Sequence, residues 1–283
     1  MKILVTGAEG FTGRYFVEAA LNRGHEVIAL KANLNDPTLL KQEVVSISPE
    51  AVIHLAGISF VGHGDTNDIY HTNILGTRNL LEALTNISSH PSSIILVSSA
   101  SVYGNTLVNY PINESTQPKP ANDYAVSKLA MEYMAQLWAD RLPITIVRPF
   151  NYTGVGQSPN FLLPKIIDHY KRRASEIELG NLDVARDFSD VRVIVQIYCL
   201  LLEREFAGET FNICSGNSFS LRDILSLIAK ISGYEINVQV TPAFVRHNEV
   251  KYQCGSNLKL INEIGDFNII SLEDTLRWML YSK

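Results

Sequence analysis

The fold is decided by the first thirteen residues, Met1-Lys-Ile-Leu-Val-Thr-Gly-Ala-Glu-Gly-Phe-Thr-Gly13. The short apolar run Ile3-Leu4-Val5 favours a strand, and the glycines that follow it lead into a helical pattern over 14–21. Glycine at such a turn permits an unusual φ, a close approach of the backbone to a pyrophosphate and tight helix packing. The first turn of the helix also offers free N–H groups to phosphates. The stretch therefore predicts a dinucleotide site at Gly7, Gly10, Phe11 and Gly13.

The same alternation of short apolar runs and amphipathic segments continues outward from this turn. Strands are expected at 24–30, 49–57, 93–99 and 143–149, and helices at 36–45, 72–83 and 123–140. This order predicts an α/β protein with a doubly wound parallel-sheet Rossmann fold.

The regular alternation ends near residue 157, which predicts a smaller C-terminal substrate-binding lobe. We assign residues 1–157 with 185–215 to the dinucleotide-binding Rossmann domain, and expect 187–199 and 208–214 to return to its sheet. Residues 158–184 with 216–283 are assigned mainly to a nucleotide-sugar-binding lobe.

Composition excludes several classes of protein. The chain has 283 residues, 46% of them apolar, and a formal net charge of −5 without a long Lys/Arg block, which argues against a nucleic-acid partner. Three widely spaced cysteines, Cys199, Cys214 and Cys254, fit reduced core thiols better than a disulfide frame or a metal site. No apolar run approaches the roughly 20 residues of a spanning helix. We expect a cytoplasmic protein with no membrane partner and no metal.

The residue after the second strand bears on the coenzyme, because an acid there accepts from the 2′-hydroxyl of NAD. Lys31 holds this place, and Arg14 follows the third glycine. Two cations tolerate a 2′-phosphate, so NADPH is favoured and NADH remains possible; the alternative for Lys31 is a solvated surface lysine. After the third strand, Leu55, Ala56 and Gly57 are expected under the ribose of the cofactor. His54, inside the apolar run, is interpreted as an interior histidine with satisfied hydrogen bonds.

Three residues predict chemistry together: Ser99, Tyr124 and Lys128. Tyr124 and Lys128 are four apart on one helix and project from one face. A phenol is a poor acid or base at neutral pH, and a nearby ammonium favours the phenolate and lowers its pKa. Ser99 lies at the hydroxyl-rich C-terminal end of the expected strand 93–99, where it can donate a hydrogen bond to a carbonyl or alcohol oxygen of the substrate. In isolation a Y-x-x-x-K pair is often a solvated helix face, but with the glycine turn the set predicts hydride transfer.

The chain resembles the nucleotide-sugar branch of the extended short-chain dehydrogenase/reductases over nearly its whole length. The T-G-x-x-G-x-x-G turn, the Asn73 helix with its N-x-x-G-T-x-N-L-L-E-A pattern and the Y-x-x-x-K pair carry the resemblance. It implies that Asn73 is a buried polar tie near the active site and cofactor. Dehydratases of this branch carry acids at the places of Ala100 and Ser101, so dehydration is not expected.

The second half is most similar to GDP-4-keto-6-deoxy-D-mannose reductases, which make GDP-D-rhamnose. Residues 150–157, 179–191 and 212–216 carry this likeness, with the R-H-N-E-V run at 246–250. It implies that Asn151, Arg186 and Arg246 hold the pyrophosphate and Glu249 the ribose, with Ser101 at the sugar. The alternative for Arg186 is a salt bridge with Asp187 or Asp190.

The resemblance thus implies NAD(P)H-dependent reduction of a nucleotide 4-keto-6-deoxy-sugar, most specifically GDP-4-keto-6-deoxy-D-mannose. Alternatives are a reductase of a dTDP-hexulose or a GDP-heptose, a 4-epimerase, and a non-catalytic NADP-sensing protein. It also implies a homodimer formed through the helices near 70–85 and 123–140.

Overall fold

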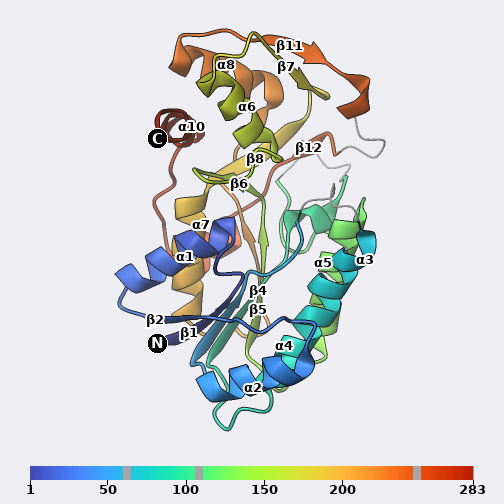
Figure 1. The fold of residues 1–283 in the computed structure, drawn as a ribbon, viewed down its shortest axis with the longest axis vertical. Coiled ribbons are helices and arrows are strands. Elements are labelled where there is room, and N and C mark those ends of the chain that lie inside the picture. Colours follow the sequence, from blue (N-terminus) through green and yellow to red (C-terminus); the bar gives the residue numbers. More distant parts are fainter. Residues whose placement is uncertain (60–64, 106–110, 245–249, 283) are drawn as a thin grey trace.

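The central feature of the molecule is a parallel sheet. The computed structural model describes residues 1–59, 65–105, 111–244 and 250–282, and within them the largest sheet has six strands in the order β2-β1-β3-β4-β5-β9 (Figure 1). Every pairing in it is parallel. The strands are β1 (Lys2–Thr6), β2 (Glu26–Ala29), β3 (Ala51–His54), β4 (Ser93–Val97), β5 (Ile144–Pro149) and β9 (Thr210–Ile213). The predicted doubly wound Rossmann-like fold is confirmed.

The strand order reverses between β1 and β3, because the chain leaves β1 for β2 on one side and then crosses to β3 on the other. In such sheets ligands bind at this switch point, beyond the carboxyl ends of the strands. The glycine turn, residues 55–57 and Ser99 all follow strands at this edge.

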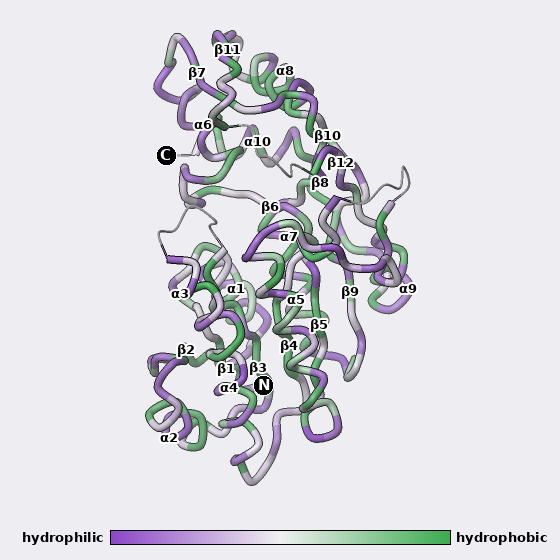
Figure 2. The backbone as a smooth tube through the Cα atoms, turned by 90° about the vertical axis from the view of Figure 1, so that its right-hand side faces the viewer, coloured by the Kyte–Doolittle hydropathy of each residue, from purple (hydrophilic) through white to green (hydrophobic). Residues whose placement is uncertain are grey.

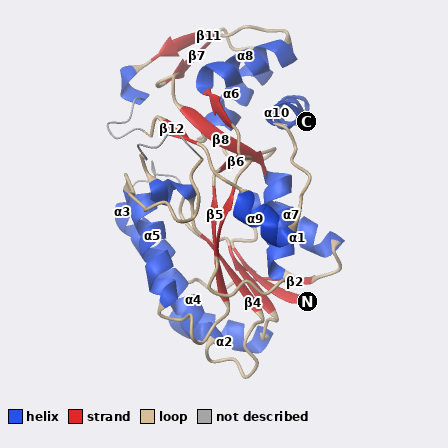
Figure 3. Cartoon of the chain, turned by 180° about the vertical axis from the view of Figure 1, so that it is seen from behind, coloured by secondary structure: helices blue, strands red, loops and turns tan. Residues whose placement is uncertain are grey.

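Helices cover both faces of the sheet (Figures 1 and 3). On one face α1 (Phe11–Asn22) packs against α7 (Val191–Leu202). The other face carries α2 (Pro37–Ile47), α3 (Thr66–Tyr70), the π-helical turn η1 (His71–Gly76), α4 (Thr77–Leu84) and α5 (Asp123–Gln136). The start of α2 is fixed locally, since Pro37 occupies the first helical position and the Asp36 carboxylate accepts from the N–H groups of Thr38 and Leu39.

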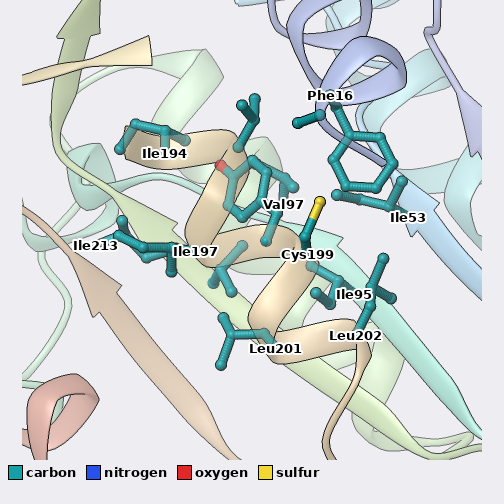
Figure 4. Packing of buried hydrophobic residues seen from close by; sticks show 14 of the residues in the cluster. Phe16, Ile53, Ile95, Val97, Ile194, Ile197, Cys199, Leu201, Leu202 and Ile213 are labelled. Carbon is teal, nitrogen blue, oxygen red and sulfur yellow. The ribbon is translucent and has the colours of Figure 1, made fainter. Parts of the chain in front are cut away.

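Apart from the edge strand β2, whose residues are exposed or half-buried, the strands are largely buried on both faces, as expected for a parallel sheet between helices. β3 and β4 are buried along their whole length. Figure 2 shows hydrophobic stretches in the strands of this sheet and also along the helices. Figure 4 shows the core on the α1 and α7 face, where Phe16 of α1 and Cys199 of α7 lie over Ile53 and Ile95.

A smaller group of elements lies beyond the carboxyl edge of the main sheet (Figure 1). In it β8 (Ala185–Asp190) pairs with β10 (Ser218–Ser220), β12 (Tyr252–Gln253) and β6 (Asn151–Thr153), and β7 (Glu176–Leu179) pairs with β11 (Asn237–Val240). The remaining elements of the chain, not all of which belong to this smaller group, are α6 (Leu162–Lys171), α8 (Leu221–Ser232), the 3-10 turns η2 (Ala100–Tyr103) and η3 (Pro242–Phe244), α9 (Leu258–Ile264) and α10 (Leu272–Tyr281). Residues of α6, α8 and α10 form a separate apolar cluster.

Two segments differ from the sequence-based expectation. Residues 187–190 belong to β8 in the second sheet and do not return to the main one, and the run after Asp190 is helix α7. Nearly all of α7 is buried, and periodicity does not separate a buried strand from a buried helix. Helix α9 was expected to belong to the smaller lobe, but its residues Leu260 and Ile264 pack into the core of the main sheet. The division into two domains stays a proposal.

The three cysteines are free and buried, which confirms their interpretation as core thiols. Among the described residues, no helix combines the length and apolar content needed to cross a membrane.

Candidate active site

The glycine turn is compact enough that side chains are excluded from it. Gly7 has a φ of +70°, and a Cβ there would lie 2.8 Å from the backbone nitrogen of Ala56. A Cβ on Gly13 would lie 2.2 Å from the carbonyl oxygen of Gly7. Gly10 precedes α1 without a side-chain cap, so the first-turn N–H groups of this helix are available to phosphate oxygens. The turn therefore fits a dinucleotide pyrophosphate.

The other residues predicted to bind the cofactor surround this turn. Backbone nitrogens of Leu55 and Ala56 donate to the carbonyl and hydroxyl oxygens of Thr6, at 3.2 and 3.1 Å. The Phe11 ring stacks on Tyr152, with centroids 6.2 Å apart. Arg14 is exposed on α1.

Lys31 is exposed directly beyond β2, as predicted, but an acid reaches the same place. Glu43 of α2 accepts from the backbone nitrogens of Lys31 and Ala32, at 2.9 and 2.6 Å. The sequence-based expectation that no acid stands at the end of the second strand is therefore incomplete, because the carboxylate arrives from the following helix.

Asn73 connects three segments of the site. It is fully buried in the π-helical turn η1, its Oδ1 accepts from the nitrogen of Ile58 at 2.9 Å, and its Nδ2 donates to Ser127 Oγ at 3.0 Å. A Cβ on Gly57 would lie 3.0 Å from Asn73 Oδ1 and 3.1 Å from Lys128 Nζ. Gly57, Asn73 and Lys128 are thus brought together, with Asn73 as the buried polar tie that the resemblance implied.

His54 is buried, and its side-chain contacts are with residues outside the predicted catalytic set. Its ring nitrogens contact the hydroxyls of Thr6 and Thr77 at 2.7 and 2.8 Å. Burial, with Lys128 as a second cause, lowers the pKa of His54 to about 3, so the ring is neutral. The interpretation as a satisfied interior histidine is confirmed.

Ser99, Tyr124 and Lys128 converge at the carboxyl end of β4. Ser99 precedes η2, and its hydroxyl is hydrogen-bonded to Tyr124. Asn122 caps α5 by accepting from Ala125 N at 2.9 Å, which sets the helix that carries Tyr124 and Lys128. The Lys128 ammonium, 6% exposed, donates to the carbonyl oxygen of Val97 at 2.9 Å.

Burial controls the protonation of this set. It raises the pKa of Tyr124 to about 12, partly offset by the hydrogen bond from Ser99. In the protein alone, removing the phenolate from water outweighs the effect of its neighbours. The expected lowering of this pKa by Lys128 together with an oxidised nicotinamide stays a prediction. Burial also lowers the pKa of Lys128 to about 8, while Glu132 raises it. At neutral pH Tyr124 holds its proton and Lys128 its charge.

A buried ion pair joins the elements that carry the predicted catalytic residues. Arg148, at the end of β5, donates to Glu132 of α5 at 2.6 Å, and the side chains are 9% and 6% exposed. Ser98 also donates to Glu132, and Arg148 donates to Tyr103 Oη at 2.9 Å. Glu132 lies one turn after Lys128 and Ser98 directly precedes Ser99, so the pair joins the strand and the helix that carry the predicted catalytic residues.

A polar cavity of about 50 Å³ opens beside Ser99. Ser101 and Asn151, both predicted to bind substrate, line it with Ser99 and Gln253. Sequence reasoning missed Gln253. Its Nε2 donates to the carbonyl oxygen of Ala100 at 2.9 Å although 153 positions separate the two residues, and no local motif signals such a contact.

The remaining predicted substrate residues are only partly described. Arg186 of β8 donates to the carbonyl oxygen of Ala185 at 2.9 Å. Its expected alternative partner Asp190 instead pairs with Arg192 at 2.7 Å, and Asp187 accepts from Ser215 N at 2.8 Å. Arg246 and Glu249 lie outside the described residues.

Residues 3–214 match the family model described as the NAD dependent epimerase/dehydratase family, which covers more than half of the chain. The chain belongs to this family. The expected membership in the nucleotide-sugar branch of the extended short-chain dehydrogenase/reductases is thereby confirmed.

Two curated relatives are each 33% identical to the chain. One is a GDP-6-deoxy-D-talose 4-dehydrogenase from Aggregatibacter actinomycetemcomitans, with 99% of this chain and 97% of the relative covered. The other is a GDP-6-deoxy-D-mannose reductase from Pseudomonas aeruginosa, with 99% and 96% covered. A solved structure of RMD from Pseudomonas aeruginosa complexed with NADPH has a TM-score of 0.89 and 31% identity, covering 99% of this chain and 96% of that one.

Proposed function

We propose that this chain reduces the 4-keto group of a nucleotide-linked 4-keto-6-deoxy-sugar, with GDP-4-keto-6-deoxy-D-mannose as the favoured substrate. The single observation that carries the proposal is the junction of Ser99, Tyr124 and Lys128 at the carboxyl end of β4. The two GDP-6-deoxy-sugar relatives, which align over nearly their whole lengths, support the choice of nucleotide and sugar.

The coenzyme would be NADPH, with NADH as the second choice, and when bound it would supply the hydride for carbon 4 of the sugar. The NADPH complex of the Pseudomonas relative and the cations Lys31 and Arg14 support this coenzyme. Gly7, Gly10, Phe11 and Gly13 would hold its pyrophosphate, residues 55–57 and Asn73 would line its ribose, and Lys128 would reach the nicotinamide ribose.

The side chains of the protein would supply the proton that the ketone oxygen gains. The hydroxyls of Ser99 and Tyr124 donate to the ketone oxygen, which orients the carbonyl and stabilises the negative charge that develops on it. As the carbonyl gains its hydride, the Tyr124 hydroxyl gives its proton to the alkoxide oxygen and becomes a phenolate. The Lys128 ammonium stabilises that phenolate until solvent returns the proton. A Tyr124 that is protonated at neutral pH suits proton donation, and hence reduction.

The residues beside Ser99 argue against the neighbouring reactions of the family. Ala100 and Ser101 stand where a dehydratase needs an acid, and neither can abstract a proton from carbon at neutral pH. A 4-epimerase would convert its sugar without net consumption of coenzyme.

The test is to incubate the protein with GDP-4-keto-6-deoxy-D-mannose and NADPH and to follow NADPH absorbance. We expect stoichiometric oxidation, a loss of about 10²–10⁴-fold in rate for Tyr124→Phe, and no loss for the matched control Tyr133→Phe, an exposed tyrosine of the same helix. No turnover with either coenzyme would refute the proposal, and sugar conversion without coenzyme consumption would indicate an epimerase. Full activity of Tyr124→Phe would refute the proton-donor role of Tyr124, whereas coenzyme binding without any turnover would favour the NADP-sensing alternative.

We also propose a homodimer. Helix α5 exposes Val126 and Tyr133, which are 40% and 58% exposed, and its C-cap residue Leu137 is 76% exposed. The three residues lie on one face at helical spacing. Leu75 of the adjacent turn η1 is 46% exposed. Light scattering should give twice the mass of the chain, and Leu137→Asp should reduce it to the mass of a monomer.

A further inference from the structure

The end of β2 holds a contact that the proposed reaction does not use. The carboxylate of Glu43 accepts from two successive backbone N–H groups, Lys31 N to Oε1 at 2.9 Å and Ala32 N to Oε2 at 2.6 Å. Glu43 is half-buried, and it comes from α2. Both of its oxygens are therefore directed at the segment that, in a dinucleotide-binding sheet, meets the adenosine ribose.

The same two N–H groups lie on the segment that also carries the Lys31 side chain. Backbone N–H groups and a lysine are suitable donors for a 2′-phosphate. Glu43 occupies these donors and adds a negative charge, so it opposes a phosphate at this place. A ribose 2′-hydroxyl, in contrast, can donate to a carboxylate. The contact thus acts against the two cations, Lys31 and Arg14, that favour a phosphorylated ribose.

We propose that Glu43 is a coenzyme-selectivity residue, which weakens the preference of this chain for a 2′-phosphorylated dinucleotide and keeps NADH usable. The proposal rests on the dinucleotide use in the proposed function and is independent of the sugar. It assigns to a residue of α2 the part that an acid on the strand end plays in the Rossmann pattern.

The chain contains a matched control for a purely structural role of such a carboxylate. Glu50 also accepts from a backbone nitrogen at a strand of the same sheet, that of Lys2 at 2.6 Å, although through one carboxylate oxygen where Glu43 uses both. Lys2 begins β1, at the edge opposite to the ligand edge. A variant of Glu50 loses a comparable contact without affecting the ribose site.

The test measures binding of 2′,5′-ADP and of 5′-ADP to the full chain by calorimetry, in wild type, Glu43→Gln, Glu43→Ala and Glu50→Gln. Both ligands are titrated into the same sample, so an inactive fraction affects both titrations alike. We expect the affinity ratio of 2′,5′-ADP to 5′-ADP to rise about tenfold in both Glu43 variants, about 1.4 kcal/mol, and to change less than about twofold in Glu50→Gln. An unchanged or lower ratio in the Glu43 variants, or an equal rise in Glu50→Gln, would overturn the proposal.

The outcome is separable from that of the proposed function. A raised ratio in a protein that reduces no keto-sugar would leave the selectivity role standing and remove the reductase. If the chain reduces the keto-sugar but its Glu43 variants bind the two ligands in the wild-type ratio, the reductase function would stand and the selectivity role of Glu43 would be refuted.

Discussion

The buried pair of Glu132 and Arg148 gives a prediction that tests the support of the site. Glu132→Gln keeps the shape of the side chain but removes its charge, and leaves the Arg148 guanidinium, which is 9% exposed, without an anion. Breaking a buried pair by removing one partner costs about 3–5 kcal/mol, because an uncompensated charge remains in the interior. For a domain of this size we expect the melting temperature to fall by on the order of 10 °C.

The matched control is Glu82→Gln, which breaks the exposed i,i+4 pair with Arg78, whose partners are 49% and 53% exposed. That change should cost no more than about 0.5 kcal/mol. Both variants are melted under identical conditions, with wild type as reference. A Glu132→Gln protein that melts within a degree or two of Glu82→Gln would refute the claim that the buried pair holds β5 and α5 together.

The same variant has a kinetic signature that a general loss of stability does not produce. Glu132 raises the pKa of Lys128, which burial lowers to about 8, so removal of the carboxylate lowers this pKa further. If the charge of Lys128 is needed, the decline of kcat/KM with rising pH moves to lower pH in Glu132→Gln. An unmoved decline would show that Lys128 does not control it.

Three further predictions concern single residues. In wild type, kcat/KM for reduction should fall as the pH rises through about 8, because Lys128 loses its proton there. Tyr124, with a pKa of about 12, keeps its proton over this range. An active Lys128→Arg variant should not show this decline. Gly208→Ala, at a φ of +84° with open space around it, should cost about 1–2 kcal/mol in urea unfolding. Gly7→Ala, with a similar φ and a Cβ 2.8 Å from Ala56 N, should cost at least about 1 kcal/mol more, and equal costs would contradict the close approach. Gln253→Leu should raise KM for the sugar about tenfold with an unchanged Kd for NADPH, whereas the exposed control Gln239→Leu should change neither; a raised Kd for the coenzyme would place Gln253 elsewhere in the mechanism.

The residues that were predictable from sequence are those whose signal is local. The turn at Gly7, Gly10 and Gly13 is predicted by the spacing of its glycines, and the pair of Tyr124 and Lys128 by their separation of one helical turn. Glu43 and Gln253 were missed because their contacts depend on how α2 and β12 pack, 12 and 153 positions from their partners. The rise in the pKa of Tyr124 could not be predicted for a related reason, since desolvation depends on everything that covers the phenol.

The buried cysteines can report opening motions of the molecule, because a buried thiol is alkylated only when the structure around it opens. Burial raises the pKa of Cys199 to about 12 and that of Cys254 above its usual range, so neither sulfur is exposed or ionised in the closed fold. Cys199 lies in the main core, whereas Cys254 follows β12 and contacts Asp187 of β8. Their alkylation rates therefore measure two events separately, the detachment of β12 from β8 and the opening of the α7 core. A coenzyme that orders the edge of the main sheet would slow both rates, and a ligand that closes only the second sheet would slow the Cys254 rate alone.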